Sequence, residues 1–310
     1  MVINKEAIAL GEHRELHLTV ARLPTHTPID LPVHVYRGEQ EGPVLLLTGG
    51  LHGDEINGIE IIRRMISRGQ LHLRRGAVIA IPLVNLYGFI QNVRGLPDGK
   101  DINRSFPGAK GGSLARLLAH TLMNQILPRA DYGIDFHTGG ASRANFPQVR
   151  SVLDVPENAE LARAFAPPVI LHSSLIDKSF RKAAHKKGKH ILVYETGESH
   201  RLDEEGIRLG IEGTLRVMKH LEMRESAPEA GETQIYRKST WVRARYAGLF
   251  RSRVAAGDTV RHRQVVGHIN DPYGTEQYKV SAPRSGRVIG LNHAPVVHKG
   301  DALMHLAYNE

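Results

Sequence analysis

The stretch LLLTGGLHGDEINGIEIIRRM, residues 45–65, decides the fold class. Its first part belongs to the apolar run PVLLLTGG, residues 43–50, which is bounded by Pro and Gly and is typical of a strand buried on both faces. Isoleucines then follow at helical spacing up to Gly69, a residue typical of a helix C-cap. A buried strand that leads into a helix indicates an α/β protein, whose functional loops lie at the carboxyl ends of parallel strands.

The same alternation continues on both sides of this stretch. It predicts a domain with a mostly parallel sheet flanked by helices over residues 1–225. The Pro-rich segment 24–32 is expected to be a turn between the first two strands. Further strands are predicted at residues 13–23, 32–38, 77–84, 132–138, 168–174 and 190–197, and helices at residues 55–68, 113–127 and 203–223.

A second domain is predicted at the C-terminal end. The segment ESAPEAGE, residues 225–232, is acidic, rich in small residues and without periodicity, as linkers are. Beyond it, short Val-rich strands alternate with turns at intervals of roughly ten residues, a spacing typical of small β-domains. We therefore expect residues 232–310 to form a small all-β sandwich or barrel.

Composition excludes several classes of protein. The chain has no cysteine, so disulfides, thiolate catalysis and cysteine metal ligands are excluded, and a metal site must use His and carboxylates. No apolar run is long enough to span a membrane, and the first residues lack the apolar region of a signal peptide. We expect a cytoplasmic enzyme with no membrane partner, although the absence of cysteine would also fit the periplasm.

The formal net charge of +9 raises the question of nucleic-acid binding. Many of the basic residues lie in the last quarter of the chain, where they are spread along apparent strands and form no recognition-helix pattern. A solvated basic face, or a funnel for an anionic substrate, explains the charge better. We expect no nucleic-acid partner.

Two histidines and a carboxylate can form a metal site. His52 and Glu55 are separated by two residues at a predicted helix start, where both side chains can converge on one point. His137 ends the strand YGIDFHT just before a glycine loop, at the same functional edge of the sheet. Such a three-ligand set leaves a fourth position open, as in catalytic zinc sites. The alternative is a packed histidine and a glutamate favoured by the helix dipole.

A general base is expected near the metal. Glu195 follows the buried strand of HILVYETGE and could take a proton from water and return it to a leaving group. The alternative for Glu195 is a residue that only ends a strand. Glu198 is a nearby rival, although its place beyond the glycine suggests a solvated side chain.

The glycine-rich stretch NVRGLPDGKDINRSFPG, residues 92–108, offers positive and polar groups. Arg94 and Arg104 are candidates to stabilise the oxyanion of a tetrahedral intermediate. Arginine beside Asn103 also suits the capture of a substrate carboxylate. The alternative is a surface loop with ordinary arginines.

The motifs HGDE, DINRSFPG, DFHTGG and YETGE, in this order, resemble those of the succinylglutamate desuccinylase/aspartoacylase family, a branch of the zinc carboxypeptidase-like enzymes. The resemblance covers residues 43–223. It implies a zinc-carboxypeptidase-like fold with a mixed, mostly parallel sheet, and a zinc-dependent deacylase in residues 1–225. One zinc ion per chain is implied as cofactor.

The resemblance also implies roles for single residues. His52 and Glu55 of HGDE and His137 of DFH match the zinc ligands, and Glu195 of YETGE matches the general base that later protonates the leaving amine. Asn103 and Arg104 match the pair that holds the substrate carboxylate. Arg94 looks like the family's oxyanion arginine, although its distance from Asn-Arg varies among members.

Some positions depart from the best-known members. Asp54 stands where the aspartoacylase form of HGDE has Asn, and the segment RANFPQVR, residues 143–150, matches no known substrate contact. The end of the chain is similar to biotinyl/lipoyl-like domains, but its turn APRSG carries Arg284 and no lysine, so a swinging arm is not expected. The C-terminal domain is instead expected to be a lid over the zinc site or an assembly surface.

Three functions are compatible with the sequence. The first is a zinc amidohydrolase that removes a short acyl group from an N-acylated amino acid or a related small carboxylate; the family resemblance suggests an acetylated diamino acid derived from ectoine as one substrate. The second is a zinc carboxypeptidase that acts on peptides. The third is a non-catalytic scaffold that binds anionic partners. The sequence leaves open whether the chain forms a homo-oligomer.

Overall fold

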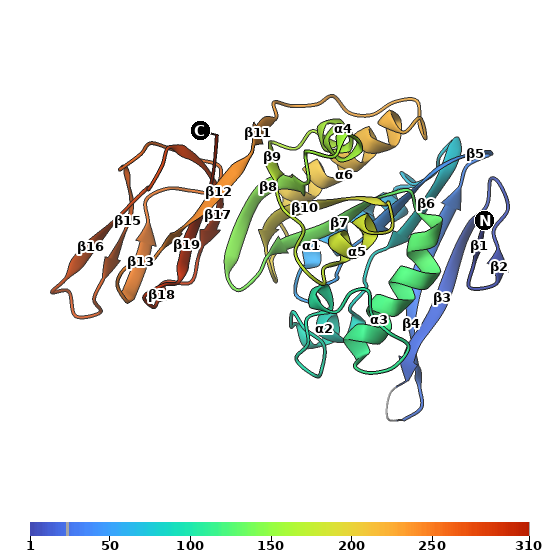
Figure 1. Ribbon diagram of the computed structural model, residues 1–310, viewed down its shortest axis with the longest axis horizontal. Coiled ribbons are helices and arrows are strands. Elements are labelled where there is room, and N and C mark those ends of the chain that lie inside the picture. The colour runs from blue at the N-terminus through green and yellow to red at the C-terminus, as the bar shows by residue number, and fades with distance from the viewer. Residues whose placement is uncertain (23–24, 310) are drawn as a thin grey trace.

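A computed structural model of the chain describes residues 1–22 and 25–309. Leu23 and Pro24, which we expected at a strand end and in a turn, lie outside the described residues. In Figure 1 the described chain is a mixed α/β body from which a C-terminal β region (residues 234–308) extends on one side. Among the described residues, no helix combines the length and the apolar character needed to span a membrane.

One large mixed sheet organises the protein. In order across the sheet the strands are β3 (His13–Arg22), β4 (Pro28–Arg37), β6 (Arg75–Ile81), β5 (Gln40–Thr48), β7 (Tyr132–Gly139), β10 (His190–Glu198), β8 (Arg143–Ser151), β17 (Gly286–Asn292), β19 (Ala302–Tyr308) and β12 (Lys238–Arg243). The strands β6, β5, β7 and β10 are parallel neighbours, whereas the strands on both flanks of this group pair antiparallel to it.

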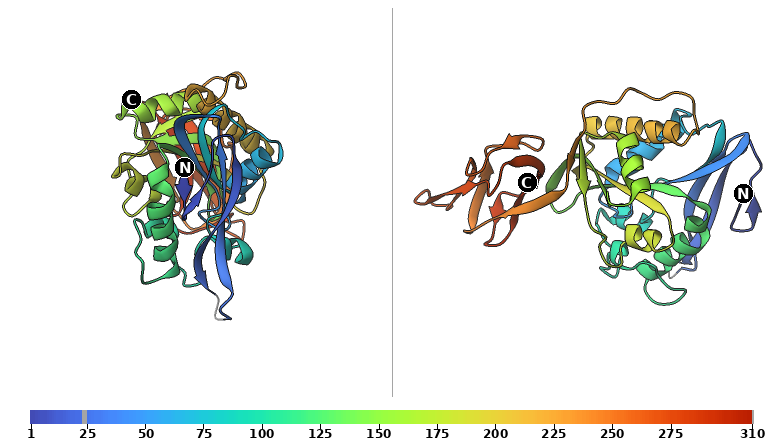
Figure 2. Two further views of the ribbon diagram at one scale, coloured as in Figure 1. Left: turned by 90° about the vertical axis from the view of Figure 1, so that its right-hand side faces the viewer. Right: turned by 45° about the horizontal axis from the view of Figure 1, so that its top comes forward.

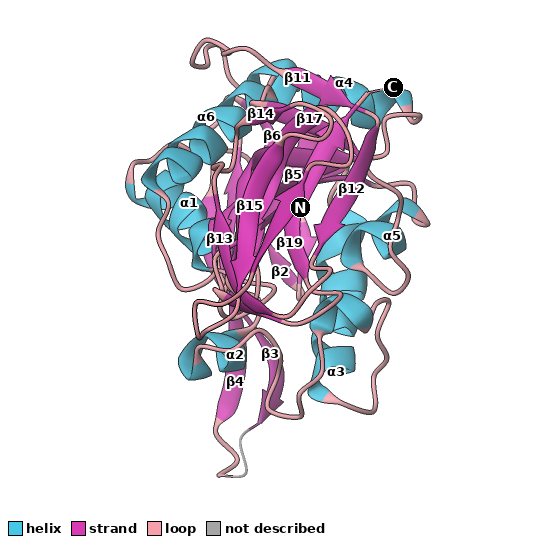
Figure 3. Cartoon of the chain, turned by 90° about the vertical axis from the view of Figure 1, so that its left-hand side faces the viewer, coloured by secondary structure: helices cyan, strands magenta, loops and turns pink. Residues whose placement is uncertain are grey.

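Helices cover both faces of this sheet. The helices are α1 (Ile56–Ser67), α2 (Leu86–Gln91), α3 (Leu114–Thr121), α4 (Pro156–Phe165), α5 (Phe180–His185) and α6 (Glu204–His220), and short helical turns are η1 (Ile102–Arg104), η2 (Leu122–Ile126) and η3 (Leu127–Arg129). Figure 3 shows α1 and α6 on one side of the strands and α3 and α5 on the other. The predicted α/β architecture is confirmed, with parallel pairing concentrated at the centre of the sheet.

The apolar run at residues 43–50 contributes to two hydrophobic cores, one on each face of the sheet. Leu46 of β5 packs in the core that includes Leu118 of α3 and Phe180 of α5. Leu45 and Leu47, which point to the opposite face, pack in a second core formed with α1, α4 and α6. Because Leu45, Leu46 and Leu47 are all buried although they point to alternate faces, the strand is apolar there without alternation.

The C-terminal β region is all-β, as expected, and it continues the large sheet. β17 pairs with β8, so the sheet runs without interruption from the α/β body into this region, as Figure 2 also shows. A second sheet contains β16 (Gln277–Ser281), β15 (Val265–Asn270), β13 (Gly248–Ser252) and β18 (Val296–Val297), and short strands are β1 (Val2–Ile3), β2 (Glu6–Ala7), β9 (Val169–His172), β11 (Gln234–Tyr236) and β14 (Thr259–Val260). The division into domains at residues 225–232 stays a prediction.

Candidate metal centre and active site

The turn between β5 and α1 brings His52 and Glu55 together. Glu55 is the N-cap residue of α1 and donates its backbone N–H to the His52 carbonyl at 3.2 Å. Within the described chain its side chain makes no capping hydrogen bond, so the carboxylate is free for another role. Gly53 lies against α2, where a Cβ atom would come within 1.9 Å of the Gly88 carbonyl carbon, and this close approach explains why the motif needs glycine.

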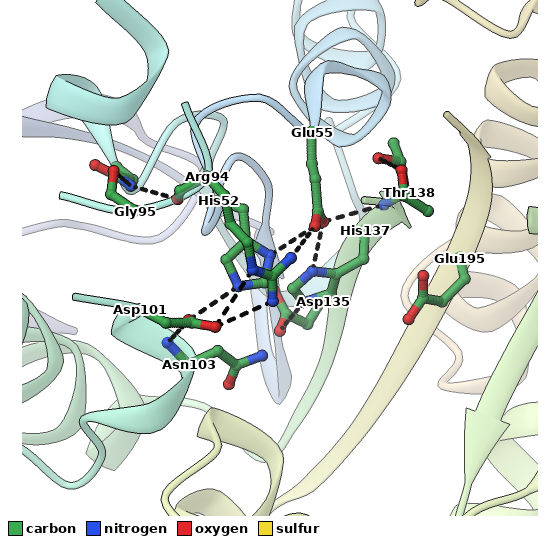
Figure 4. Close-up of polar contacts among 12 residues, drawn as sticks. His52, Glu55, Arg94, Gly95, Asp101, Asn103, Asp135, His137, Thr138 and Glu195 are labelled. Carbon is green, nitrogen blue, oxygen red and sulfur yellow. Dashed lines mark hydrogen bonds and ion pairs between the residues drawn. The ribbon is translucent and has the colours of Figure 1, made fainter. Parts of the chain in front are cut away.

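His137 and Glu195 come from the neighbouring parallel strands. His137 lies near the carboxyl end of β7, and Glu195 lies opposite it in the register of β10. Register partners on adjacent strands project to the same face of the sheet. Because both residues lie near the carboxyl ends of parallel strands, their side chains also lie at the same edge of the sheet as the β5–α1 turn. Figure 4 shows the Glu55 carboxylate between the two imidazole rings.

The three predicted ligands converge. Nδ1 of His52 lies 2.8 Å from Oε1 of Glu55, and Nδ1 of His137 lies 2.8 Å from Oε2. All three side chains are buried, with one potential ligand atom of each within 4.8 Å of the others. In residues 1–22 and 25–309, no other group of three or more His, Asp or Glu side chains has its potential ligand atoms close enough together to hold a metal ion. The cluster could hold a metal ion.

One buried atom tests whether a metal fits. Although Nδ1 of His52 is close to Glu55, it has no hydrogen-bond partner in the described structure, because the geometry is wrong for a hydrogen bond. Leaving a buried polar atom unsatisfied is costly, whereas a metal ion would use its lone pair. Two imidazole nitrogens and a carboxylate are a ligand set suited to a divalent metal. The residues therefore fit the group that the sequence implies.

Two aspartates that the sequence analysis did not assign orient the histidines. Nε2 of His52 lies 3.1 Å from Oδ1 of Asp101, and Nε2 of His137 lies 2.8 Å from Oδ2 of Asp135. Thr48 donates a hydrogen bond to the other oxygen of Asp135 at 2.7 Å. Carboxylates behind metal-binding histidines fix the ring orientation and leave the opposite nitrogen free for the metal. Both aspartates stand inside the quoted motifs DINRSFPG and DFHTGG, so their position was the available signal.

We expect Asp135→Asn to weaken metal binding by about 10–100-fold, because the amide cannot fix the His137 ring as the carboxylate does. A competition titration with a chromogenic chelator measures this. Asp131→Asn is the matched control, since this nearby aspartate accepts a hydrogen bond from the Val44 backbone and lies outside the cluster. Equal metal affinity in both variants would remove Asp135 from the metal centre.

Charges in the cluster act strongly on one another. Burial disfavours the charged form of Glu55, but the positive charges of His52 and His137 outweigh it and hold the pKa of Glu55 well below its usual value. Burial likewise disfavours the charged form of His137, yet Asp135 and Glu55 raise the pKa of His137 well above its usual value. A carboxylate that stays ionised is what a metal ligand requires.

All seven residues for which the sequence motifs implied a catalytic, substrate-binding or metal-binding role line one cavity of about 180 Å³. The Arg94 guanidinium lies 2.8 Å from Glu55 and 3.1 Å from Asp101, at the edge of the cluster. Asn103 and Arg104 lie in η1, which Asp101 caps by accepting a hydrogen bond from the Asn103 N–H. Among the described residues, no carboxylate pairs with Arg104, so its charge faces the cavity uncompensated.

Glu195 lies on the opposite wall of the cavity and is held from β8. Its Oε2 accepts a hydrogen bond from Nδ2 of Asn145 at 2.7 Å, and Nη1 of Arg150 lies 3.2 Å from its Oε1. Figure 4 shows its carboxylate apart from the cluster around Glu55. Glu198, the rival, pairs instead with His293 of the C-terminal β region at 2.9 Å.

Arg181 is a further cavity residue that the sequence analysis missed. Its Nη2 donates hydrogen bonds to the oxygens of Ser173 and Ser174, but over residues 1–22 and 25–309 its buried Nη1 has no partner and no carboxylate pairs with it. Burial beside the charge of Arg150 lowers the pKa of Arg181 to about 10. An unpaired buried cation is costly unless an anion binds beside it. The sequence offered no signal, because Arg181 lies in a basic helix of ordinary appearance.

Known proteins are similar to this chain over more than half of its length. A family model for the succinylglutamate desuccinylase/aspartoacylase catalytic domain matches residues 41–221. N-alpha-acetyl-L-2,4-diaminobutyric acid deacetylase of Halomonas elongata is 30% identical over 292 residues, which cover 89% of this chain and 85% of that protein.

Solved structures share the whole architecture. The structure of succinylglutamatedesuccinylase/aspartoacylase from Rhodobacter sphaeroides is similar with a TM-score of 0.85 and 29% identity, and 96% of each chain is covered. The product-bound ectoine utilization protein of Ruegeria pomeroyi also has a TM-score of 0.85, at 23% identity over 96% of this chain and 95% of that one. These similarities extend through the C-terminal β region.

Proposed function

The chain belongs to the succinylglutamate desuccinylase/aspartoacylase family, and we propose that it is a zinc-dependent amidohydrolase that removes a short acyl group from an N-acylated amino acid or a related small carboxylate. The family assignment made from the sequence motifs is confirmed. Membership makes the chain a hydrolase of N-acyl amide bonds. Zinc, the substrate and the role of each residue are the proposed parts.

One observation carries the proposal. A single cavity contains a cluster that could hold a metal, a separate carboxylate on Glu195, and the cationic side chains of Arg104 and Arg181. The first two supply the groups for hydrolysis, and the last two supply positive charge for a substrate carboxylate. A cavity of about 180 Å³ suits a small molecule better than an extended peptide.

The residues would divide the work as follows. His52, Glu55 and His137 would hold zinc, which when bound supplies a Lewis acid for the acyl carbonyl and makes water nucleophilic near neutral pH. Glu195 would accept a proton from the attacking water and deliver it to the leaving amine. Arg94 would donate a hydrogen bond to the oxygen on which negative charge develops. Asn103 and Arg104 would hold the substrate carboxylate, with Arg181 adding positive charge behind it.

Release of free amine from a panel of N-acyl amino acids tests the function. The panel contains N-alpha-acetyl-L-2,4-diaminobutyric acid, N-acetyl-L-aspartate, N-succinyl-L-glutamate and N-acetylglycine, with two unblocked dipeptides for comparison. We expect release from a subset of the N-acyl compounds and not from the dipeptides. Faster cleavage of the dipeptides would favour the carboxypeptidase alternative. The cytoplasmic location stays a prediction, and the oligomeric state stays open.

We expect Arg104→Met to raise KM by about 10–100-fold with a smaller change in kcat, because a charge-assisted hydrogen bond to the substrate is lost. The amide analogue of the best panel substrate, which lacks the carboxylate, should lose little affinity on the same substitution. Arg116→Met on α3 is the control, since Arg116 does not line the cavity. An equal effect on acid and amide would show that Arg104 does not bind the carboxylate.

A further inference from the structure

We propose that Asn145 is a positioning residue for Glu195 and that β17 of the C-terminal β region holds Asn145 in place. The proposal rests on the role of Glu195 as general base in the proposed function. The C-terminal β region thereby contributes to the geometry of the active site in addition to lying next to it.

The Glu195 carboxylate is held at both oxygens by β8. Asn145 donates to Oε2 at 2.7 Å, and Arg150 lies 3.2 Å from Oε1. The Glu195 side chain is only 12% exposed, so water contributes little to its orientation. Because the two contacts engage different oxygens, they fix the rotation of the carboxylate as well as its position. Of the two partners, Asn145 is the more buried, at 8% exposed.

Asn145 is held in turn by the strands on both sides of β8. It pairs with Gly197 of β10 on one side and with Gly290 of β17 on the other. A Cβ atom on residue 290 would lie 3.0 Å from Oδ1 of Asn145 and 3.3 Å from Cβ of His305. Glycine at this position therefore leaves the space that the Asn145 amide occupies. The Cβ atom of His305 limits how far β17 can move away from Asn145.

Other contacts keep β17 in register with β8. Nε2 of Gln148 donates to the Ile289 carbonyl at 2.7 Å, and the His293 N–H donates to the Ser142 carbonyl at 2.8 Å. Figure 1 shows β17 beside β8, between the α/β body and the remaining strands of the C-terminal β region. A shift of β17 would therefore move Asn145 and, through it, the carboxylate of Glu195.

A general base is sensitive to such shifts, since a displacement of about 1 Å can lower a rate by about 100-fold. We expect Asn145→Ala to lower kcat by about 10–100-fold while KM and metal content stay nearly constant. Gly290→Val should act in the same direction without altering any group that contacts Glu195, and Gly290→Ala should act more weakly. Arg143→Ala is the control, because Arg143 lies on the same strand but contacts Trp241 and not Glu195.

A double-mutant cycle with Glu195→Gln separates positioning from a general loss of structure, using the panel substrate that the wild-type protein cleaves fastest. If Asn145 acts through Glu195, Asn145→Ala should cause no further fall in kcat in the Glu195→Gln background. Crystal structures of Asn145→Ala and Gly290→Val add a readout besides activity, and we expect the Glu195 carboxylate to be displaced in both. Unchanged melting temperatures would show that the variants fold.

The outcomes are distinguishable. If Glu195→Gln itself retains wild-type turnover, the proposed function fails and the inference fails with it. If Glu195→Gln is inactive but Asn145→Ala and both Gly290 variants retain kcat, the proposed function stands and the inference is wrong. Additive losses in the cycle, or a Glu195 carboxylate that stays in place in the crystal structures, would also overturn it. If Asn145→Ala does not fold, the Gly290 variants decide.

Discussion

Glu195→Gln should lower kcat by about 10²–10⁴-fold, the range that general acid–base catalysis contributes. The substitution preserves the shape of the side chain and removes its ability to take a proton. Glu195 lines the cavity but is not among the three converging side chains proposed as ligands, so bound metal should stay at the wild-type level. Steady-state kinetics and elemental analysis on the same preparation measure both quantities.

Glu198→Gln is the matched control for this prediction. It makes the same chemical change three residues further along, at a carboxylate that pairs with His293 and does not line the cavity. We expect its kcat to stay close to that of the wild-type protein. Turnover of Glu195→Gln within tenfold of wild type, with metal unchanged, would exclude Glu195 as the base.

His137→Ala should abolish both metal binding and turnover. The substitution removes one of the three buried side chains proposed as ligands, and it leaves the Glu55 carboxylate and Asp135 without their common partner. Because a metal that binds only the folded state raises the melting temperature, added zinc should stabilise the wild-type protein and not the variant. Differential scanning calorimetry with and without zinc measures this.

His34→Ala controls for the loss of any partly buried histidine. His34 lies on β4, outside the metal cluster, and its Nδ1 has no hydrogen-bond partner in the described part of the chain. Zinc should stabilise this variant as it does the wild type. If His137→Ala still binds zinc with wild-type affinity, the ligand set is wrong.

The central strands and the convergence of the three proposed ligands were predictable because local patterns encode them. The run around Leu46 is apolar at every position since the strand packs on both faces, and the adjoining helix begins at Ile56, one residue from the expected start. His52, Glu55 and His137 each follow or end such a strand, and the carboxyl ends of parallel strands meet at one edge. The sequence therefore indicated that they converge, although not that Nδ1 of each histidine faces Glu55.

The strand β8 was not predicted, and its composition explains why. Pro147 interrupts the segment, and a proline normally argues against a strand inside a sheet. In the structure β17 pairs with residues 143–145 and β9 with residues 148–151, so Pro147 lies where the partner strand changes and its missing N–H leaves no gap in the ladder. The expected turn before β4 is also shorter than predicted, since β4 begins at Pro28.

The contacts of Asn145 and Arg150 could not be predicted from the sequence for a related reason. They depend on partners far away in the chain: Gly290 pairs with Asn145, and Glu195 lies between Asn145 and Arg150. No local periodicity encodes such long-range pairing. The segment that matched no known substrate contact thus contributes two of the side chains that hold the proposed base.

The most direct test of a zinc-dependent amidohydrolase is metal analysis coupled to amine release on one preparation purified without chelator. We expect about one zinc ion per chain and release of amine from at least one N-acyl compound of the panel. Removal of the zinc by a chelator should stop the release, and readdition should restore it. If the protein binds no metal even after reconstitution, or if release continues after the zinc is removed, the account of His52, Glu55 and His137 is wrong.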